Sequence, residues 1–138
     1  MTRIFWDTHL FLYLFEGGTS ADDVKRLRER MLARGDKLFT SSVTMAEILV
    51  RPVAAGVGVA DVYETAIARA ATILPFDATA ARHYAALRAE PTIDPTDAMQ
   101  LSCAAAAGID MFITNDDRLS GKVVPGVKFI TSLSRAFL

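Results

Sequence analysis

The sequence is poor in cysteine and in long apolar runs, and each shortage excludes a class of protein. One cysteine among 138 residues cannot form an intramolecular disulfide or a cysteine metal cage, so a disulfide-stapled secreted scaffold and a zinc ribbon are excluded. The longest uncharged stretch, residues 98–109, has 12 residues, fewer than the roughly 18 that span a bilayer. Asp7 interrupts the first apolar run too early for a secretory signal. We therefore expect a cytoplasmic protein with no membrane segment.

An excess of charge of either sign is also lacking. The chain has 15 basic and 16 acidic residues and a net charge of -1, so it does not have the general basic footprint of a protein that coats nucleic acid. Any attraction for nucleic acid must be local. Hydrophobic residues make up 51% of the chain, and a chain of this length can bury a substantial core. We expect a single domain over residues 1–138.

Short apolar β-type runs alternate with helical segments, which predicts an α/β fold with a parallel sheet of about five short strands and helices on both faces. Strands buried on both sides need few polar side chains, as here. The expected strands are residues 3–6, 38–41, 72–76, 110–114 and 127–131. The expected helices are residues 8–16, 21–34, 43–55, 59–71, 78–90 and 95–107, with a last turn after residue 132.

Four acidic residues are expected at one edge of this sheet. Asp7 follows the first strand, and Asp116 follows the strand that ends at Thr114. The carboxyl ends of strands are where open α/β sheets bind ligands. Glu47 and Asp97 lie near the starts of helices, which face the same edge in a right-handed βαβ arrangement.

Four carboxylates in one cleft would repel one another, and no arginine or lysine directly adjoins them in sequence. A divalent cation would relieve the repulsion. Oxygen ligands without histidine or cysteine suit Mg²⁺ or Mn²⁺, which also bind phosphate oxygens. Such an ion lowers the pKa of a bound water and stabilises charge on a phosphoryl group, which indicates phosphodiester hydrolysis.

Each acid also has an ordinary explanation, because acids are favoured near helix N-termini. Asp97 would complete a capping box opened by Asp94, and Glu47 would complete one opened by Thr44. Simple capping of a helix or turn would account for three acids that follow strands: Asp7, Asp77 and Asp116.

Four short segments together resemble the PIN-domain family, and in particular the VapC-type toxin ribonucleases of bacterial toxin-antitoxin pairs. The segments are residues 4–8 (IFWDT), 42–49 (SVTMAEIL), 96–101 (TDAMQL) and 112–116 (FITND). The segments extend from residue 4 to residue 116, over most of the chain, and the combination of their order and spacing carries the resemblance. The resemblance implies a three-layer α/β/α PIN-like fold.

The resemblance also implies a site and partners. Four acids would form the Mg²⁺ site, with Mn²⁺ as a substitute: Asp7, Glu47, Asp97 and Asp116. The hydroxyl of Thr114, beside the last acid, would orient a ligand or water. We prefer Asp116 over the adjacent Asp117 because Thr-Asn-Asp is the usual run in the family. The implied protein is an endoribonuclease acting on single-stranded RNA, the toxin of a type II toxin-antitoxin system, homodimeric and blocked by a small antitoxin.

Other residues invite weaker interpretations. Arg118 and Lys122 lie just beyond Asp116 and are candidates for phosphate contacts. The basic helix at residues 21–34 also carries acids, which is typical of a solvated surface. His9 is two residues from Asp7, but a lone helical histidine is usually structural.

The apolar segment at residues 9–15 exceeds the needs of one buried helix face, so part of it could meet a partner. In the family the early helices form the antitoxin groove, which would include Leu12, Phe15, Val50 and Val53.

Two other functions remain open at this point. A small-molecule phosphatase would use Asp7 as nucleophile, but that chemistry normally requires a second aspartate where this chain has His9. A non-catalytic protein-binding PIN-like module would use the acids as caps only and bind a partner through the apolar first helix.

Overall fold

Five parallel strands form the central layer of the chain. The computed structural model describes residues 2–56 and 58–136. The strands are β1 (Arg3–Trp6), β2 (Lys37–Ser41), β3 (Thr72–Leu74), β4 (Met111–Thr114) and β5 (Phe129–Ser132). They are arranged in the order β3-β2-β1-β4-β5, and every neighbouring pair is parallel. The predicted five-stranded sheet is therefore confirmed.

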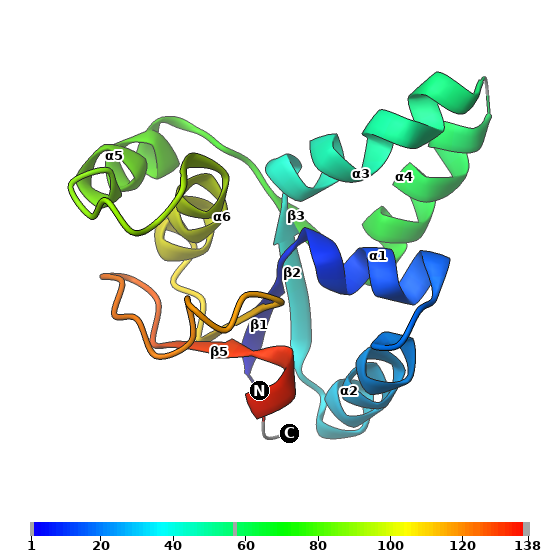
Figure 1. Ribbon diagram of the computed structural model, residues 1–138, viewed down its shortest axis with the longest axis horizontal. Coiled ribbons are helices and arrows are strands. Elements are labelled where there is room, and N and C mark those ends of the chain that lie inside the picture. Colours follow the sequence, from blue (N-terminus) through cyan, green and yellow to red (C-terminus); the bar gives the residue numbers. More distant parts are fainter. Residues whose placement is uncertain (1, 57, 137–138) are drawn as a thin grey trace.

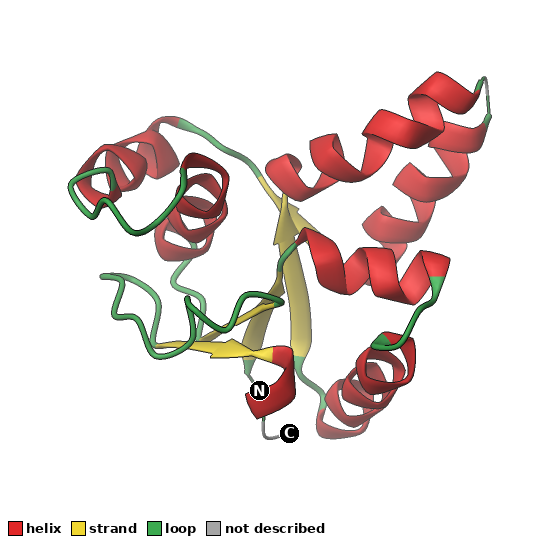
Figure 2. Cartoon of the chain, in the orientation of Figure 1, coloured by secondary structure: helices red, strands yellow, loops and turns green. Residues whose placement is uncertain are grey.

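Helices cover both faces of the sheet, as Figures 1 and 2 show. One layer contains α1 (Thr8–Glu16), α2 (Ala21–Arg34), α3 (Ser42–Ala55) and α4 (Val59–Ala70), and the opposite layer contains α5 (Ala78–Leu87) and α6 (Pro95–Ala106). A short 3-10 turn, η1 (Leu133–Arg135), follows the last strand. The predicted three-layer α/β/α fold is confirmed. No helix in the described part of the chain is long and apolar enough to cross a membrane.

Both faces of the sheet are apolar. Successive strand residues point to opposite sides, and the side chains on each side are apolar. In β1, Ile4 and Trp6 pack into the core under α1 to α4, whereas Phe5 packs into the core under α5 and α6. All three side chains are fully buried. Phe5 stacks on Phe112 of the neighbouring β4, with ring centroids 4.8 Å apart. Burial on both sides explains why these strands lack alternating polar residues.

Side-chain caps fix where several helices begin. Asp94 accepts a hydrogen bond from the backbone N–H of Asp97 at 3.0 Å, and Asp77 caps α5 in the same way. Both caps are as predicted. The capping box expected from Thr44 is wrong, because α3 begins at Ser42 and its cap is the preceding Ser41, which accepts from the Thr44 N–H.

The strand order reverses direction between β1 and β4, since β1 leads to β2 on one side and β4 lies on the other. In open parallel sheets the crevice at the carboxyl ends of two such strands is the usual ligand site. The loops that follow β1 and β4 carry Asp7 and Asp116.

Candidate active site

Asp7 is the buried centre of this edge. Its side chain follows β1 and is only 8% exposed. One carboxylate oxygen, Oδ2, accepts hydrogen bonds from the Thr114 hydroxyl at 2.7 Å and the Asn115 N–H at 3.2 Å. The other oxygen, Oδ1, is buried without a hydrogen-bond partner among the described residues. Burial raises the pKa of Asp7, against the hydrogen bond from Thr114.

Asp7 also occupies the N-cap position of α1, but its side chain makes no cap hydrogen bond to that helix. The Leu10 backbone N–H in the first turn lowers the pKa of Asp7 only weakly, so capping does not account for this acid. An unpartnered buried carboxylate oxygen carries a desolvation cost, which a cation or a bound water would remove.

Thr114 connects the ends of the two strands. Its hydroxyl donates to Asp7 and accepts from the backbone N–H of Asp116 at 3.0 Å. This chain of contacts ties the position of Asp116 to that of Asp7. Asp117, the alternative acid, is exposed and lines the same cavity as Asp116. It also accepts a hydrogen bond from the Ser134 hydroxyl at 3.4 Å.

Asp97 reaches the same edge from the first turn of α6. Its pKa is raised from the ordinary 3.8 to about 7, first by burial and then by the negative charges of Asp94, Asp7 and Asp116. A helix N-terminus would by itself favour the charged form of an acid. The raised pKa therefore reports that carboxylates of several elements face one another here.

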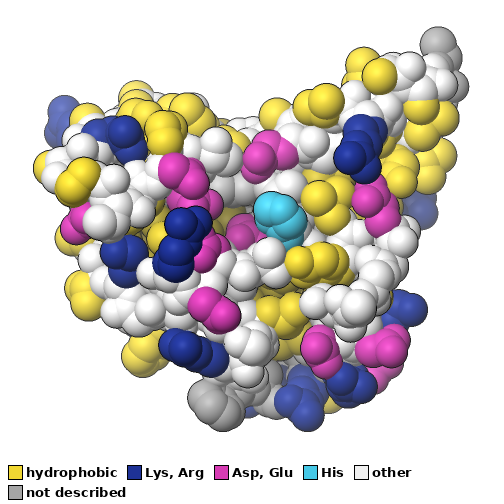
Figure 3. All heavy atoms as spheres, viewed as in Figure 1, with side chains coloured by type: hydrophobic (Ala, Val, Ile, Leu, Met, Phe, Trp, Pro, Cys, Tyr) yellow, Lys and Arg dark blue, Asp and Glu magenta, His cyan; other side chains and the backbone are white. Residues whose placement is uncertain are grey.

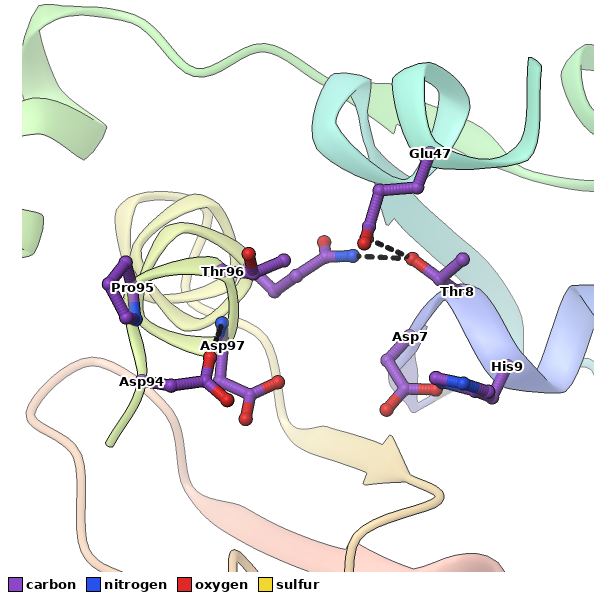
Figure 4. Close-up of a pocket in the computed structure, with 9 residues that line it drawn as sticks. Asp7, Thr8, His9, Glu47, Asp94, Pro95, Thr96 and Asp97 are labelled. Carbon is purple, nitrogen blue, oxygen red and sulfur yellow. Dashed lines mark hydrogen bonds between the residues drawn. The ribbon is translucent and has the colours of Figure 1, made fainter. Parts of the chain in front are cut away.

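Glu47 approaches from α3 and is held by Thr8. The Thr8 hydroxyl donates to Glu47 Oε1 at 2.5 Å and accepts from the Gln100 amide at 3.1 Å. Figure 4 shows Glu47 directed from its helix toward Thr8, with Asp7 and Asp97 facing each other across the pocket below.

Gln100 is the residue that sequence reasoning missed. Its side chain is 1% exposed and accepts from Ser41 at 2.5 Å while donating to Thr44 at 2.6 Å and to Thr8. It thereby joins α6, α3 and α1 behind the acids. The available signal was a glutamine three residues after Asp97 on a helix whose neighbouring positions are apolar.

Two adjoining cavities, of about 340 and 560 Å³, lie over these residues. Both are lined by Asp7, His9, Asp94 and Asp97. Glu47 lines the first, and Thr114 and Asp116 line the second. The structure thus brings all five predicted site residues to one edge. Figure 3 shows acidic side chains gathered around the middle of this face, with basic side chains beside them.

One acid has a basic neighbour in space, although no arginine or lysine directly adjoins the four acids in sequence. Arg118 binds Asp116: its Nη2 lies 2.9 Å from Oδ2, its Nε 3.1 Å from Oδ1, and its backbone N–H also donates to Oδ1. This guanidinium lowers the pKa of Asp116. The sequence alone did not reveal this pair, because the conformation of the turn decides whether residues 116 and 118 are in contact.

The remaining candidates lie at or beyond the rim. His9 is exposed and borders both cavities, with its ring 6.4 Å from that of Tyr13. Lys122 donates to Thr92 and lines neither cavity. On the basic helix α2, Arg26 pairs with Asp23, as expected of a solvated surface.

The apolar surface expected beside the site is partly present. Val50 and Val53 on α3 are 68% and 63% exposed, whereas Leu12 and Phe15 on α1 are half-buried. Leu12 and Val50 line a further cavity of about 370 Å³ together with Glu47.

The residues at this edge fit a hard divalent cation. In residues 2–56 and 58–136 no three Asp, Glu, His or Cys side chains are already gathered closely enough to hold an ion together. Mg²⁺ does not require such a group, because it keeps several waters and binds one or two carboxylates directly. Two carboxylates are suitable oxygen donors: Asp7, whose Oδ1 has no partner among the described residues, and Asp97, which other acids repel.

Comparison with known proteins gives one family match and several structural ones. The PIN domain family matches residues 4–123. The fold is similar to VapBC2 from Rickettsia felis bound to a promoter DNA fragment, with a TM-score of 0.72 and 19% identity over 95% of this chain and 98% of that one.

Two further solved structures are similar over nearly their full length. DNA-bound VapBC from Salmonella typhimurium has a TM-score of 0.69 and 23% identity, covering 96% of this chain and 99% of that one. VapBC-5 of the VapBC toxin-antitoxin family from Mycobacterium tuberculosis has a TM-score of 0.60 and 24% identity, with the same coverage. A comparison with curated proteins finds no match.

Proposed function

Since the chain belongs to the PIN-domain family, whose pattern spans residues 4–123, we propose that it is a metal-dependent endoribonuclease. Its substrate is single-stranded RNA, and it hydrolyses phosphodiester bonds with Mg²⁺, or with Mn²⁺ as a substitute. The acidic site consists of Asp7, Glu47, Asp97 and Asp116. Thr114 orients the carboxylate of Asp7.

One observation carries this proposal: Asp7, which has a buried carboxylate oxygen without a partner among the described residues, lines the same cavities as other acids at the switch point of the sheet. Asp7 lines both cavities, and the pKa of Asp97, which lines them too, is raised to about 7. An acid kept only for stability would be expected to find a donor or a solvated position. A site that receives a cation leaves its ligand oxygens free.

The site residues have different roles in this proposal. Asp7 and Asp97 would hold the ion, while Glu47 and Asp116 add negative charge at the two ends of the cavity pair. Thr114 holds Asp7 through Oδ2 and so leaves Oδ1 available. When bound by these carboxylates, Mg²⁺ would supply an activated water and neutralise charge on the phosphoryl oxygens. Gln100 keeps Thr8, and through it Glu47, in place.

We further propose that the protein is the toxin of a type II toxin-antitoxin pair and forms a homodimer. The similar solved structures are toxin-antitoxin complexes, which supports a small antitoxin as partner. The cavity beside Leu12, Val50 and Glu47 places exposed apolar surface next to the acids, where a bound antitoxin segment would obstruct the site.

Cleavage of single-stranded RNA tests the proposal. Wild-type protein is expected to cut a labelled RNA with Mg²⁺ or Mn²⁺ and to lose the activity in EDTA. Asp7→Asn keeps the size of the side chain but weakens the ligand, and should reduce cleavage at least a hundredfold. Asp77→Asn, at the N-cap of α5 and outside both cavities, is the matched control and should cleave normally. Cleavage that survives EDTA or Asp7→Asn would refute the assignment.

A further inference from the structure

Arg118 has an unusual position in the site. Among the residues described, it is the one Lys or Arg side chain that lines either of the two cavities. All the other charged side chains there are acids, with His9 at the rim. A nuclease site must accept a phosphate, which is an anion, among these acids. The cavity pair therefore holds one group suited to bind it.

That group is bound to an acid of the site. The Arg118 guanidinium contacts both carboxylate oxygens of Asp116, at 2.9 Å to 3.3 Å. The geometry is the planar fork that guanidinium uses equally well with carboxylate and with phosphate. Asp116 is therefore engaged by a side chain that competes with any cation for the same oxygens.

The pair is also free to separate. The Arg118 side chain is 85% exposed, and the Asp116 side chain is 27% exposed. An exposed ion pair contributes at most about a fivefold preference for its closed form. The backbone N–H of Arg118 continues to hold Asp116 Oδ1 at 2.9 Å, so the acid keeps its place when the guanidinium leaves.

We propose that Arg118 exchanges partners: it covers Asp116 in the empty site and moves to a phosphate of the RNA when substrate and cation bind. The residue is thus a phosphate-binding residue and, in the empty site, a competitor of the cation. This inference rests on the proposed function. It predicts opposite effects of one substitution on the two ligands.

The chain offers a matched control. Arg34 pairs with Asp36, also two residues away, at 3.1 Å. That pair lies between the end of α2 and the start of β2, at the amino end of the strands and so away from the site. Arg34→Ala removes the same side chain and the same charge as Arg118→Ala.

Two binding measurements test the exchange. The first titrates Mn²⁺ alone into metal-free protein, followed by electron paramagnetic resonance. Arg118→Ala should bind Mn²⁺ up to about fivefold more tightly than wild type, because Asp116 is released. Arg34→Ala should match wild type.

The second measures fluorescence anisotropy of a labelled single-stranded RNA pool of randomised sequence in an Asp7→Asn background that suppresses cleavage. Mn²⁺ is present at a concentration that saturates the Asp7→Asn protein, because this background binds the ion more weakly. Arg118→Ala should weaken RNA binding about tenfold and reduce the slope of log affinity against log salt by about 0.7, the value for one phosphate contact on a single strand. Arg118→Lys should keep the salt slope and recover part of the affinity.

The outcomes separate the alternatives. A residue that only positions Asp116 would, when removed, weaken Mn²⁺ binding and leave the RNA salt slope unchanged, which would overturn the exchange. If Arg118→Ala binds RNA as tightly as the Arg34→Ala control does, the exchange is overturned as well. If none of the variants, including wild type, binds or cleaves RNA, the proposed nuclease function fails too.

Discussion

Replacing Asp97 by asparagine should stabilise the metal-free protein at neutral and alkaline pH, although Asp97 is a proposed site residue. The folded chain raises the pKa of Asp97 from 3.8 to about 7, so folding favours the protonated form. This contribution to stability is fully present below pH 4 and is lost as the pH rises through about 7. At pH 8 the wild-type protein therefore keeps an unfavourable charge that Asp97→Asn removes.

The magnitude follows from the pKa and the exposure. A pKa of about 7 against 3.8 sets a ceiling of about 4 kcal/mol. Asp97 is only partly buried, so solvent screens part of this energy, and loss of an acid from the first turn of α6 costs roughly 0.3 to 1 kcal/mol. About 1 to 2 kcal/mol remains, which for a chain of this length raises the Tm by roughly 3 to 6 °C.

Thermal unfolding followed by circular dichroism in EDTA, between pH 4 and pH 8, measures the effect. The Tm difference between Asp97→Asn and wild type should be near zero at pH 4 and grow to its full value by pH 8. Mg²⁺ should raise the Tm of wild type more than that of the variant. Asp77→Asn preserves a helix cap and serves as control. A variant that is less stable than wild type at pH 8, or a difference independent of pH, would refute the reasoning.

Two other substitutions have defined effects on stability. Gln100→Leu leaves the hydroxyls of Thr8 and Thr44 without their buried amide partner, so urea unfolding should show a loss of about 2 to 4 kcal/mol; a loss below about 1 kcal/mol would contradict the role of this network. Gly126→Ala forces a side chain onto a backbone with φ of +96° and places its Cβ 2.9 Å from the Ala105 carbonyl oxygen, so a loss of at least about 1 to 3 kcal/mol is expected, and unchanged stability would show that this turn relaxes freely.

Most of the fold could be predicted because short buried strands and glycine-terminated helices leave clear local signals. The bounds of α1 and α2 agree with the prediction, and Gly35 ends α2 in the left-handed conformation. Later elements differ by one to three residues at their ends. The final strand begins at Phe129 rather than residue 127, because the pairing partner Met111 on β4 sets its start, and partners far apart in sequence leave no local pattern.

The site was predicted in its acids but not in its supporting contacts. Asp7 and Asp116 follow strands, and the position of a strand end is readable from sequence. Gln100 was not identified, because a polar residue on an apolar helix does not reveal its partners, which here come from β2, α1 and α3. The pair between Arg118 and Asp116 was missed for a different reason, since the conformation of the connecting turn decides whether the two side chains meet.

Binding of Mn²⁺ to metal-free protein tests most directly the claim that these acids form one cation site. Wild type is expected to bind the ion, Asp7→Asn to bind it at least tenfold more weakly, and Asp77→Asn to match wild type. Equal Mn²⁺ affinity of wild type and Asp7→Asn, or no binding by wild type, would contradict the account.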